Sequence, residues 1–367
     1  MINIYLYTFI DFSFALSILF FVGWKLSLMK IWTKSKVKKS SKQFYDSSTI
    51  SVVIPFRNEE KNLQILLESI SKLHPIPKEI IFVNDHSDDN SVNMIENFDL
   101  EFPKVVLNLE ESDFGKKKAL RQGINFCSGD FILCWDADIK VKKDFFASLE
   151  KTAISEILLL PVKMKGKNLL SFFAEIDFYY INNLNVSCFG LFKPILANGA
   201  NLLFNKNSFL KNDSIQKHGQ ITSGDDVFIL NDFKRDKKSV SMSLDRNLIV
   251  DTNAPSDFNE FVMQRLRWIK KTNRVGDSFA NFIGILGILY HIGFLLLFIL
   301  IDYSFAVILL KMLLDVIVLT SFLFKIKHSL LLVFVPLFSI IYPFYIFFIA
   351  VSSLFVKPEW KERVLYK

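Results

Sequence analysis

The sequence predicts an α/β domain with a mostly parallel β-sheet, joined to transmembrane α-helices. Two observations lead to this fold class. First, 51% of the 367 residues are hydrophobic, and the longest apolar runs lie outside a central part of mixed composition. Second, short β-branched segments alternate with segments of helical periodicity within that central part, which is the pattern of a parallel sheet covered by helices.

We divide the chain into five parts on this basis. They are a transmembrane anchor at 1–28, a basic juxtamembrane linker at 29–46, the α/β domain at 47–275, a transmembrane region of about three segments at 276–356 and a basic tail at 357–367. Basic residues follow the first apolar run instead of preceding it, which favours an uncleaved anchor over a signal peptide. Because basic loops stay inside, we expect a multi-pass cell-membrane protein whose α/β domain faces the cytoplasm.

The net charge of +7 is concentrated beside the predicted spans, so attraction to anionic membrane lipids explains it without nucleic acid. Three C-terminal spans are expected at 279–301, 303–324 and 329–356. Strict alternation would place the basic tail outside, so either one segment is interfacial or re-entrant, or the positive-inside tendency fails here. Lys311 and Asp315, four residues apart in the middle span, indicate that this span does not simply face lipid.

Acidic residues follow two of the predicted strands. Asp85 comes after the strand at 79–83, and Asp136 and Asp138 come after the strand at 131–135. The carboxyl ends of parallel strands meet at one edge of a sheet, where open α/β sheets bind ligands, so we expect these acids to lie together. Mg²⁺ or Mn²⁺ held by Asp138 would allow such an acidic edge to bind a nucleotide diphosphate. For the Asp-x-Asp motif alone, a solvated turn is the alternative.

Four further motifs have both a functional and a structural interpretation. Lys116 opens a predicted helix, so it either binds phosphate or belongs to a solvated basic helix start. Asp225 and Asp226 either act in proton transfer or cap a helix. Gly199 either permits a close backbone approach to a ligand or belongs to an ordinary turn. The segment 264–268 either binds phosphate and sugar or lies at the membrane interface.

The order of these motifs resembles glycosyltransferase family 2, a group of the GT-A fold that includes cellulose and hyaluronan synthases. Six motifs carry the resemblance: Val-Ile-Pro-Phe-Arg-Asn-Glu-Glu (53–60), Val-Asn-Asp-His-Ser-Asp-Asp (83–89), Gly-Lys-x-x-Ala-Leu (115–120), Asp-Ala-Asp (136–138), Ser-Gly-Asp-Asp (223–226) and Gln-Arg-x-Arg-Trp (264–268). Each motif alone is weak, but six in one order across the α/β domain are highly specific. Asn84 departs from the acid that many members carry, which puts the donor preference in doubt.

The resemblance implies a role for each matched residue. It implies that a nucleotide-sugar donor lies against Pro55, Phe56, Arg57, Asn58, Glu59, Asp85, Lys116, Asp136 and Gly199. It implies that Asp138 and Asp136 hold the metal, that Asp226 is the general base with Asp225 as its helper, and that Gln264, Arg265, Arg267 and Trp268 contact the diphosphate and the acceptor. A single carboxylate base opposite the leaving group is what an inverting transfer requires.

The implied function is a membrane-bound, metal-dependent, inverting transfer of a sugar from a nucleotide-diphosphate sugar to a lipid-linked or polysaccharide acceptor. A catalytically silent nucleotide-binding scaffold would not need Asp85, Asp138, Asp226 and Trp268 together. A membrane transporter would leave more than half of the chain unexplained. Processive synthesis and transfer of a single sugar to a lipid carrier both stay open, and the sequence identifies neither the donor sugar nor any protein partner.

Overall fold

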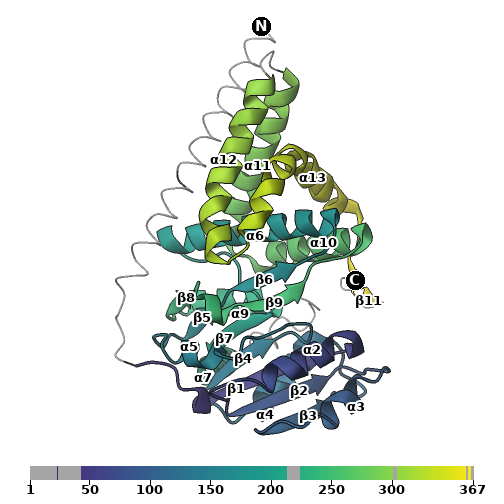
Figure 1. The fold of residues 1–367 in the computed structure, drawn as a ribbon, viewed down its shortest axis with the longest axis vertical. Coiled ribbons are helices and arrows are strands. Elements are labelled where there is room, and N and C mark those ends of the chain that lie inside the picture. Colours follow the sequence, from purple (N-terminus) through teal and green to yellow (C-terminus); the bar gives the residue numbers. More distant parts are fainter. Residues whose placement is uncertain (1–22, 24–42, 213–223, 301–303, 361–362, 365–367) are drawn as a thin grey trace.

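The computed structural model describes residues 23, 43–212, 224–300, 304–360 and 363–364 (Figure 1). The predicted N-terminal anchor, apart from Gly23, and most of the basic linker lie outside these residues. Figure 1 shows an α/β domain at one end of the molecule and long helices at the other. Two further helices, α6 (Leu169–Leu191) and α10 (Phe258–Val275), lie across the boundary between these parts.

The described residues form a seven-stranded sheet in the order β3-β2-β1-β4-β7-β5-β8. Its first half is parallel, since β1 pairs in parallel with β2 and β4, and β2 with β3, while β7 runs antiparallel to β4 and β5. The predicted mostly parallel α/β sheet is therefore confirmed. The strands are β1 (Ile50–Phe56), β2 (Glu79–Asn84), β3 (Lys104–Asn108), β4 (Phe131–Trp135), β5 (Ile157–Leu159), β7 (Asn201–Asn205) and β8 (Val240–Met242).

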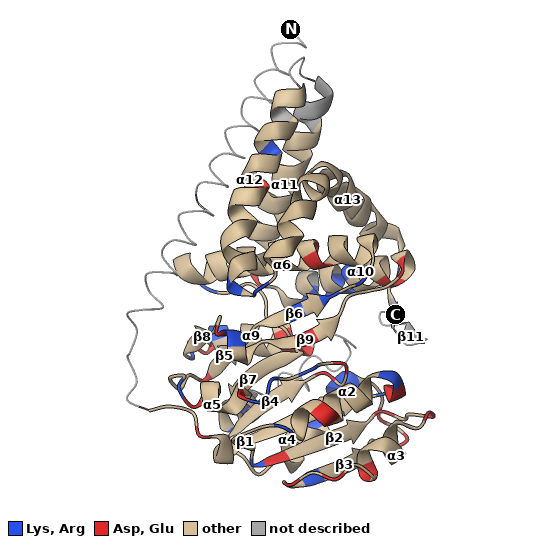
Figure 2. Cartoon of the chain, viewed as in Figure 1, with Lys and Arg blue, Asp and Glu red and all other residues tan. Residues whose placement is uncertain are grey.

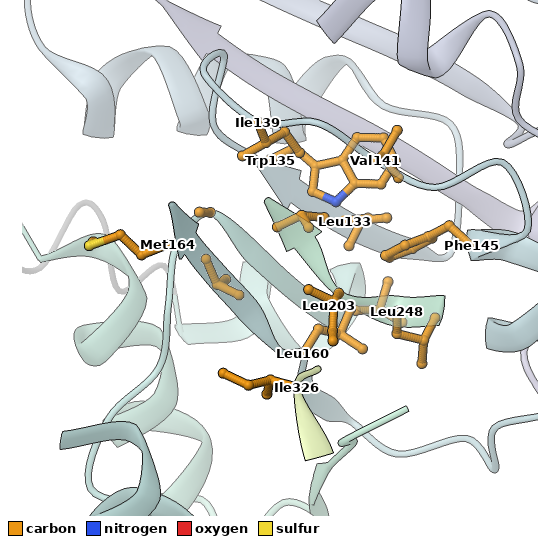
Figure 3. Packing of buried hydrophobic residues seen from close by; sticks show 14 of the residues in the cluster. Leu133, Trp135, Ile139, Val141, Phe145, Leu160, Met164, Leu203, Leu248 and Ile326 are labelled. Carbon is orange, nitrogen blue, oxygen red and sulfur yellow. The ribbon is translucent and has the colours of Figure 1, made fainter. Parts of the chain in front are cut away.

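Helices cover both faces of this sheet because its central strands are apolar on both sides. Alternate residues of β1 enter different cores: Val52 joins the cluster around Trp135, which Figure 3 shows, and Val53 joins a second cluster with α4. Gly123 lets α4 pack closely, because a Cβ there would lie 2.6 Å from Val53 Cγ1. The covering helices are α2 (Glu60–Ile70), α3 (Ser91–Glu96), α4 (Lys116–Phe126), α5 (Phe145–Leu149), α7 (Lys206–Asn212) and α9 (Asp225–Arg235).

A second, two-stranded parallel sheet connects the α/β domain to the boundary helices. It consists of β6 (Val162–Lys165) and β9 (Val250–Asn253), and it lies below α6 in Figure 1. The isolated bridge between Lys140 and Asp251 ties β9 to the chain that follows β4. The remaining short elements are η1 (Ser47–Thr49), η2 (Arg246–Leu248), β10 (Glu359–Trp360) and β11 (Arg363–Val364).

The three C-terminal apolar segments form the helices α11 (Ser278–Leu300), α12 (Ser304–Lys325) and, after η3 (Ser329–Phe334), α13 (Val335–Phe355). Within the described residues, two stretches are long and apolar enough to cross a membrane: Ser278–Leu295, with a mean hydropathy of 1.6, and Ser329–Phe355, with 2.3. Figure 2 shows charged residues over the α/β domain and on α6 and α10, with few on α11 to α13. This charge distribution is typical of a domain bound at a membrane surface.

Lys311 and Asp315 form a buried ion pair within α12. Their relative exposures are 4% and 1%, and Lys311 Nζ lies 2.5 Å from Asp315 Oδ2. The hydroxyl of Tyr180 on α6 donates to Asp315 Oδ1 at 3.3 Å. The expectation that this segment does not simply face lipid is therefore confirmed, because the pair packs against a protein side chain.

A carboxyl and an imidazole meet where η3 contacts α6. Glu175 is 1% exposed, its Oε1 accepts from the Gly166 amide at 2.5 Å, and its Oε2 lies 3.2 Å from His328 Nδ1. Burial raises the pKa of Glu175 to about 7. Burial, together with the charge of Lys163, lowers the pKa of His328 to about 4. Between these two values both side chains are neutral, so their contact is not a charged pair there.

We expect Glu175→Gln to stabilise the protein more at about pH 8 than at about pH 5.5. The folded carboxyl keeps its proton up to about pH 7, whereas the unfolded one loses it near 4.5. The wild-type contribution is therefore fully present below about 4.5 and is lost as the pH rises towards 7. Glutamine does not titrate, and His328 titrates in both proteins. Thermal unfolding of both in detergent gives the difference, and a difference independent of pH would contradict the shifted pKa.

Candidate active site

The carboxyl ends of β1 and β2 are joined through Asp85. Its side chain is 2% exposed, and its Oδ2 accepts from the Gly115 amide at 3.1 Å. The Arg57 guanidinium, just after β1, donates to the backbone carbonyl of Asp85 at 3.0 Å. Gly115 has φ +97° at the start of α4, a conformation that favours glycine. Asp85 therefore connects the ends of two strands to the first turn of α4.

Asn58 holds the loop after β1 in place. It has φ +49°, which asparagine tolerates better than most residues. Its amide N–H donates to Ser87 Oγ at 3.0 Å, and its side-chain amide donates to Asp88 Oδ1 at 2.6 Å. The predicted donor-binding residues Pro55, Phe56, Arg57, Asn58 and Glu59 thus end β1 or follow it directly, beside the loop that carries Asp85.

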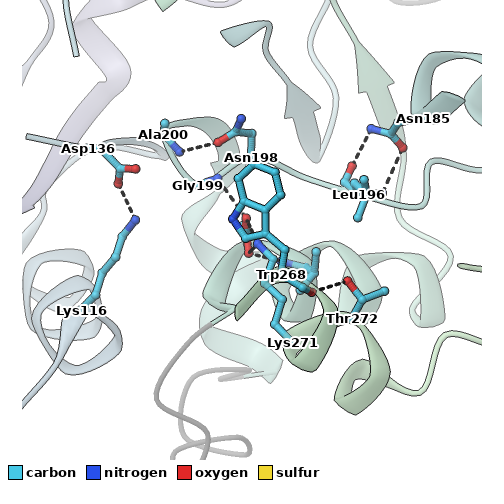
Figure 4. A network of polar contacts seen from close by, with 12 residues as sticks. Lys116, Asp136, Asn185, Leu196, Asn198, Gly199, Ala200, Trp268, Lys271 and Thr272 are labelled. Carbon is cyan, nitrogen blue, oxygen red and sulfur yellow. Dashed lines mark hydrogen bonds and ion pairs between the residues drawn. The ribbon is translucent and has the colours of Figure 1, made fainter. Parts of the chain in front are cut away.

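Lys116 links Asp136 to Gly199 and Asp225. Its ammonium donates to Asp136 Oδ1, as Figure 4 shows. A Cβ placed on Gly199 would lie 3.5 Å from Lys116 Nζ and 3.4 Å from Asp225 Oδ2, so glycine leaves this space open. Burial alone would lower the pKa of Lys116, but the charges of Asp136 and Asp225 hold it well above its usual value. Lys116 is therefore a fixed positive charge among carboxylates.

Asp138 is contacted by a side chain of the second sheet. Its Oδ2 accepts a hydrogen bond from Thr252 Oγ1 on β9 at 2.8 Å. Burial, followed by the charges of Asp136 and Glu59, raises the pKa of Asp138 to about 6. Thr252 was not predicted from the sequence, because it lies 114 residues from Asp138 and no local pattern relates them.

Asp136 and Asp138 suit a divalent cation that shares its coordination with a ligand. Among the described residues, no group of three or more His, Cys, Asp or Glu side chains is arranged to hold a metal ion. Two carboxylates are nevertheless a usual protein contribution to a Mg²⁺ site, in which phosphate oxygens and water complete the shell. Burial and then the charge of Asp136 raise the pKa of Asp138, and a bound cation would favour its ionised form. The donor set therefore fits the predicted Mg²⁺ or Mn²⁺.

Asp226 lies in the first turn of α9 and is surrounded by hydrogen-bond donors. Lys271 Nζ on α10 lies 2.8 Å from Oδ2 and 3.0 Å from Oδ1, the Gly199 amide donates to Oδ2 at 3.2 Å, and the Val227 amide donates to Oδ1 at 2.8 Å. Burial would raise the pKa of Asp226, but the charge and hydrogen bonds of Lys271 bring it below its usual value. Asp226 is therefore ionised at neutral pH.

Lys271 is a site residue that the sequence reasoning missed. It follows Trp268 by three residues, so both lie on neighbouring turns of one helix face. That spacing, next to a predicted motif, was the available signal. Gly224 is also essential to this contact: it has φ +90°, and a Cβ there would lie 3.0 Å from Lys271 Cβ. Glycine thus lets the start of α9 approach α10.

Trp268 is partly buried on α10 and points towards the loop of Asn198 and Gly199 (Figure 4). Its ring packs over the Arg265 guanidinium at 4.4 Å and against Phe178, with ring centroids 6.1 Å apart. Gln264 and Arg267 lie on the same helix and are also partly buried.

Arg265 is buried where α10 packs on α6. It is 3% exposed, its Nε donates to Asp177 Oδ2 at 2.6 Å, and another guanidinium nitrogen donates to the Ala174 carbonyl at 2.9 Å. These contacts join α10 to α6, while the guanidinium also lies against the Trp268 ring. The guanidinium thus holds α10 to α6, and the contact of Arg265 with the diphosphate or acceptor stays a prediction.

The structure thus brings together most of the predicted site. The contacts given above bring together residues from separate segments, at the carboxyl edge of the sheet and beside α10: Asp85, Lys116, Asp136, Asp138, Gly199, Asp225, Asp226 and Trp268. Figure 4 shows Lys116, Asp136, Gly199 and Trp268 of this set. Ser223, the first residue of the predicted Ser-Gly-Asp-Asp motif, lies outside the described residues.

Part of the α/β domain is similar in sequence to known proteins. Residues 51–156 match the family described as glycosyl transferase family 2. The chain is 38% identical over 95 residues to an undecaprenyl-phosphate 4-deoxy-4-formamido-L-arabinose transferase of Yersinia enterocolitica, covering 25% of this chain and 29% of that protein. It is 33% identical over 115 residues to a poly-beta-1,6-N-acetyl-D-glucosamine synthase of Staphylococcus epidermidis, covering 31% and 27%. The alignments thus span less than a third of these relatives.

A solved structure shares the fold over nearly the whole chain. It is a mannosyltransferase from Pyrobaculum calidifontis in complex with GDP-Man and Mn²⁺, with a TM-score of 0.54 and 15% sequence identity. The alignment covers 94% of this chain and 99% of that one. This likeness shows that the chain shares the fold of that protein. Residues 51–156 are thus similar to glycosyl transferase family 2.

Proposed function

We propose that this protein is a membrane-bound, inverting glycosyltransferase that moves a sugar from a nucleotide-diphosphate sugar to a hydroxyl of a lipid-linked or polysaccharide acceptor. One observation carries the proposal. Lys116 contacts Asp136 and also lies beside Gly199, where Asp225 and Asp226 converge. Asp136, which is proposed to lie beside the leaving group, and Asp226, the proposed base, are therefore within one site, although they are about 90 residues apart in the sequence.

The proposed reaction is a single displacement. The acceptor oxygen forms a bond to the anomeric carbon as the bond from that carbon to the diphosphate breaks, and the acceptor proton passes to Asp226. Lys116 compensates the negative charge on the departing nucleoside diphosphate. Asp138 and Asp136 would hold Mg²⁺ or Mn²⁺, which supplies further positive charge for the leaving group. Asp225 lies beside Asp226 as its helper, and Trp268 provides a flat face for a sugar ring.

The membrane assignment rests on α11, η3 with α13, and the boundary helices α6 and α10. Charged residues gather at the domain side of this boundary, and the proposed base contacts α10 directly. An acceptor carried by a lipid would therefore be within reach of the site. The predicted cytoplasmic orientation and multi-pass topology belong to this proposal. The names of the two relatives include a lipid-phosphate acceptor and a polysaccharide product, and both acceptor types are retained.

A donor screen tests the proposal. The detergent-solubilised full chain would be incubated with UDP- and GDP-sugars in the presence of Mn²⁺ or Mg²⁺, with and without extracted membrane lipid. We expect release of nucleoside diphosphate from one donor, together with a labelled product. A lipid-extractable product would indicate transfer to a lipid carrier, and a polymer would indicate processive synthesis. Release from no donor would contradict the proposed activity.

Removal of divalent metal is expected to lower turnover by roughly 100-fold or more, because the diphosphate then leaves without its main counter-charge. Turnover would be measured in excess EDTA and again after addition of Mn²⁺, which should restore it. EDTA already saturated with Mn²⁺ is the matched control and should have no effect. If the rate in excess EDTA is undiminished, Asp136 and Asp138 do not hold a metal ion that the reaction needs.

A further inference from the structure

The proposed base has no room for a substrate in this structure. Each oxygen of the Asp226 carboxylate already has two donors among the described residues: Oδ1 faces the Val227 amide and Lys271, and Oδ2 faces the Gly199 amide and Lys271. A carboxylate offers about four lone-pair positions. An acceptor hydroxyl must donate to one of them before its proton can be removed. One of the present donors therefore has to leave.

Lys271 is the donor that is able to leave. The Val227 amide belongs to α9 and the Gly199 amide to the chain before β7, so moving either would disturb the backbone. Lys271 reaches Asp226 through a flexible four-carbon stem, and its side chain is 13% exposed. Breaking its ion pair without compensation would leave two partly buried charges unpaired, which is costly. Lys271 therefore needs another anion nearby.

The diphosphate of the donor is such an anion. Asp226 Cβ and Lys116 Nζ both lie 3.5 Å from the position of a Cβ on Gly199, so the base adjoins the lysine that contacts Asp136. Resting on the proposed function, we infer that Lys271 is a switch between two partners. It occupies Asp226 when no donor is bound, and it moves to the diphosphate when the donor binds, which frees the base for the acceptor hydroxyl.

The switch makes the base available only when a donor is present. In the donor-free state, the ammonium of Lys271 blocks Asp226 from other hydroxyl groups. Once Lys271 has moved, it adds a second lysine to Lys116 on the leaving group, where negative charge develops. Lys271 would then act twice in one cycle, first by holding the base and then by contacting the donor.

A double-mutant cycle in nucleotide binding tests this switch independently of catalysis. Affinity for UDP and for GDP, each with Mn²⁺, would be measured by calorimetry on the full chain in detergent. The four proteins are the wild type, Asp226→Asn, Lys271→Met and the double variant. We expect Asp226→Asn to tighten nucleotide binding at least about threefold, because Lys271 no longer has to leave a carboxylate. Adding Lys271→Met should reverse this gain and weaken binding about tenfold relative to Asp226→Asn.

The decisive result is whether the two substitutions are coupled. If Asp226→Asn tightens binding equally with and without Lys271, only the removal of a nearby negative charge is acting, and the switch is wrong. Lys270→Met is the matched control, since Lys270 is the preceding lysine on α10 and donates to the Val356 carbonyl at 2.7 Å. It should leave nucleotide affinity unchanged. Lys271→Gln replaces Lys271→Met if the latter unfolds.

The same measurements separate the two proposals. Uncoupled effects in a wild type that binds nucleotide and turns over a donor would overturn the switch alone. A wild type that binds neither UDP nor GDP and turns over no donor would overturn the proposed function, and the switch with it.

Discussion

Asp226→Asn is expected to lower the rate of sugar transfer by about 10³-fold, because a positioned general base contributes about 10²–10⁴ to such a reaction. Asparagine has nearly the same shape but cannot accept the acceptor proton. The loss should appear in kcat and not as a raised KM for the donor, since the groups proposed to bind the diphosphate are unchanged. Steady-state kinetics with the donor and acceptor found by the screen would measure both constants.

The control for this variant is Asp236→Asn, at the exposed C-terminal end of the same helix. It removes the same charge without changing the site, so its kcat should equal that of the wild type. If Asp226→Asn retains the wild-type kcat, Asp226 is not the base. A raised donor KM at unchanged kcat would instead assign Asp226 to donor binding.

Asp177→Asn is expected to cost about 3–5 kcal/mol of unfolding free energy, because it leaves the Arg265 guanidinium without its counter-charge. Asp177 is 1% exposed, and besides Arg265 it accepts from the hydroxyl of Tyr342 on α13 at 2.7 Å. One carboxylate thus connects α6, α10 and α13. Denaturant-induced unfolding in detergent would measure the loss, with the loss of α-helical signal as the readout.

Two further variants measure what the ion pair between Asp177 and Arg265 contributes to the free energy of unfolding. Asp99→Asn removes an exposed aspartate between α3 and β3 and should change stability by less than about 0.5 kcal/mol. Replacing both partners, in Asp177→Leu with Arg265→Met, should recover much of the stability, because no unpaired charge is left in the interior. A single Asp177→Asn variant as stable as the wild type would contradict the importance of this pair.

The sheet and the edge that carries the site were predictable because their signals are local. The β-branched runs that became β1, β2 and β4 are each followed by a polar site residue, and parallel strands necessarily bring those residues to one edge. The pairing of Lys311 with Asp315 was also predictable, since residues four apart share a helix face. The antiparallel insertion of β7 between β4 and β5 had no such signal.

The motif on α10 shows the limit of this reasoning. Arg265 and Arg267 are two residues apart, so on a helix their side chains leave in directions about 200° apart and favour different faces. The sequence reasoning assigned both to the diphosphate and the acceptor. The structure shows Arg265 buried against Asp177 on α6, a partner 88 residues away. Which face of α10 meets the site is decided only by how α10 packs between α6 and α9.

By itself, the sequence determined the α/β class, the separation of a mixed domain from apolar segments, and the acids expected at the sheet edge. Each of these follows from composition, periodicity or the direction of a strand, which are properties of neighbouring residues. Only the tertiary structure paired Lys271 with Asp226 across 45 residues and Thr252 with Asp138 across 114. Such contacts depend on the distances and rotations at which whole helices and strands pack, and no local pattern encodes those.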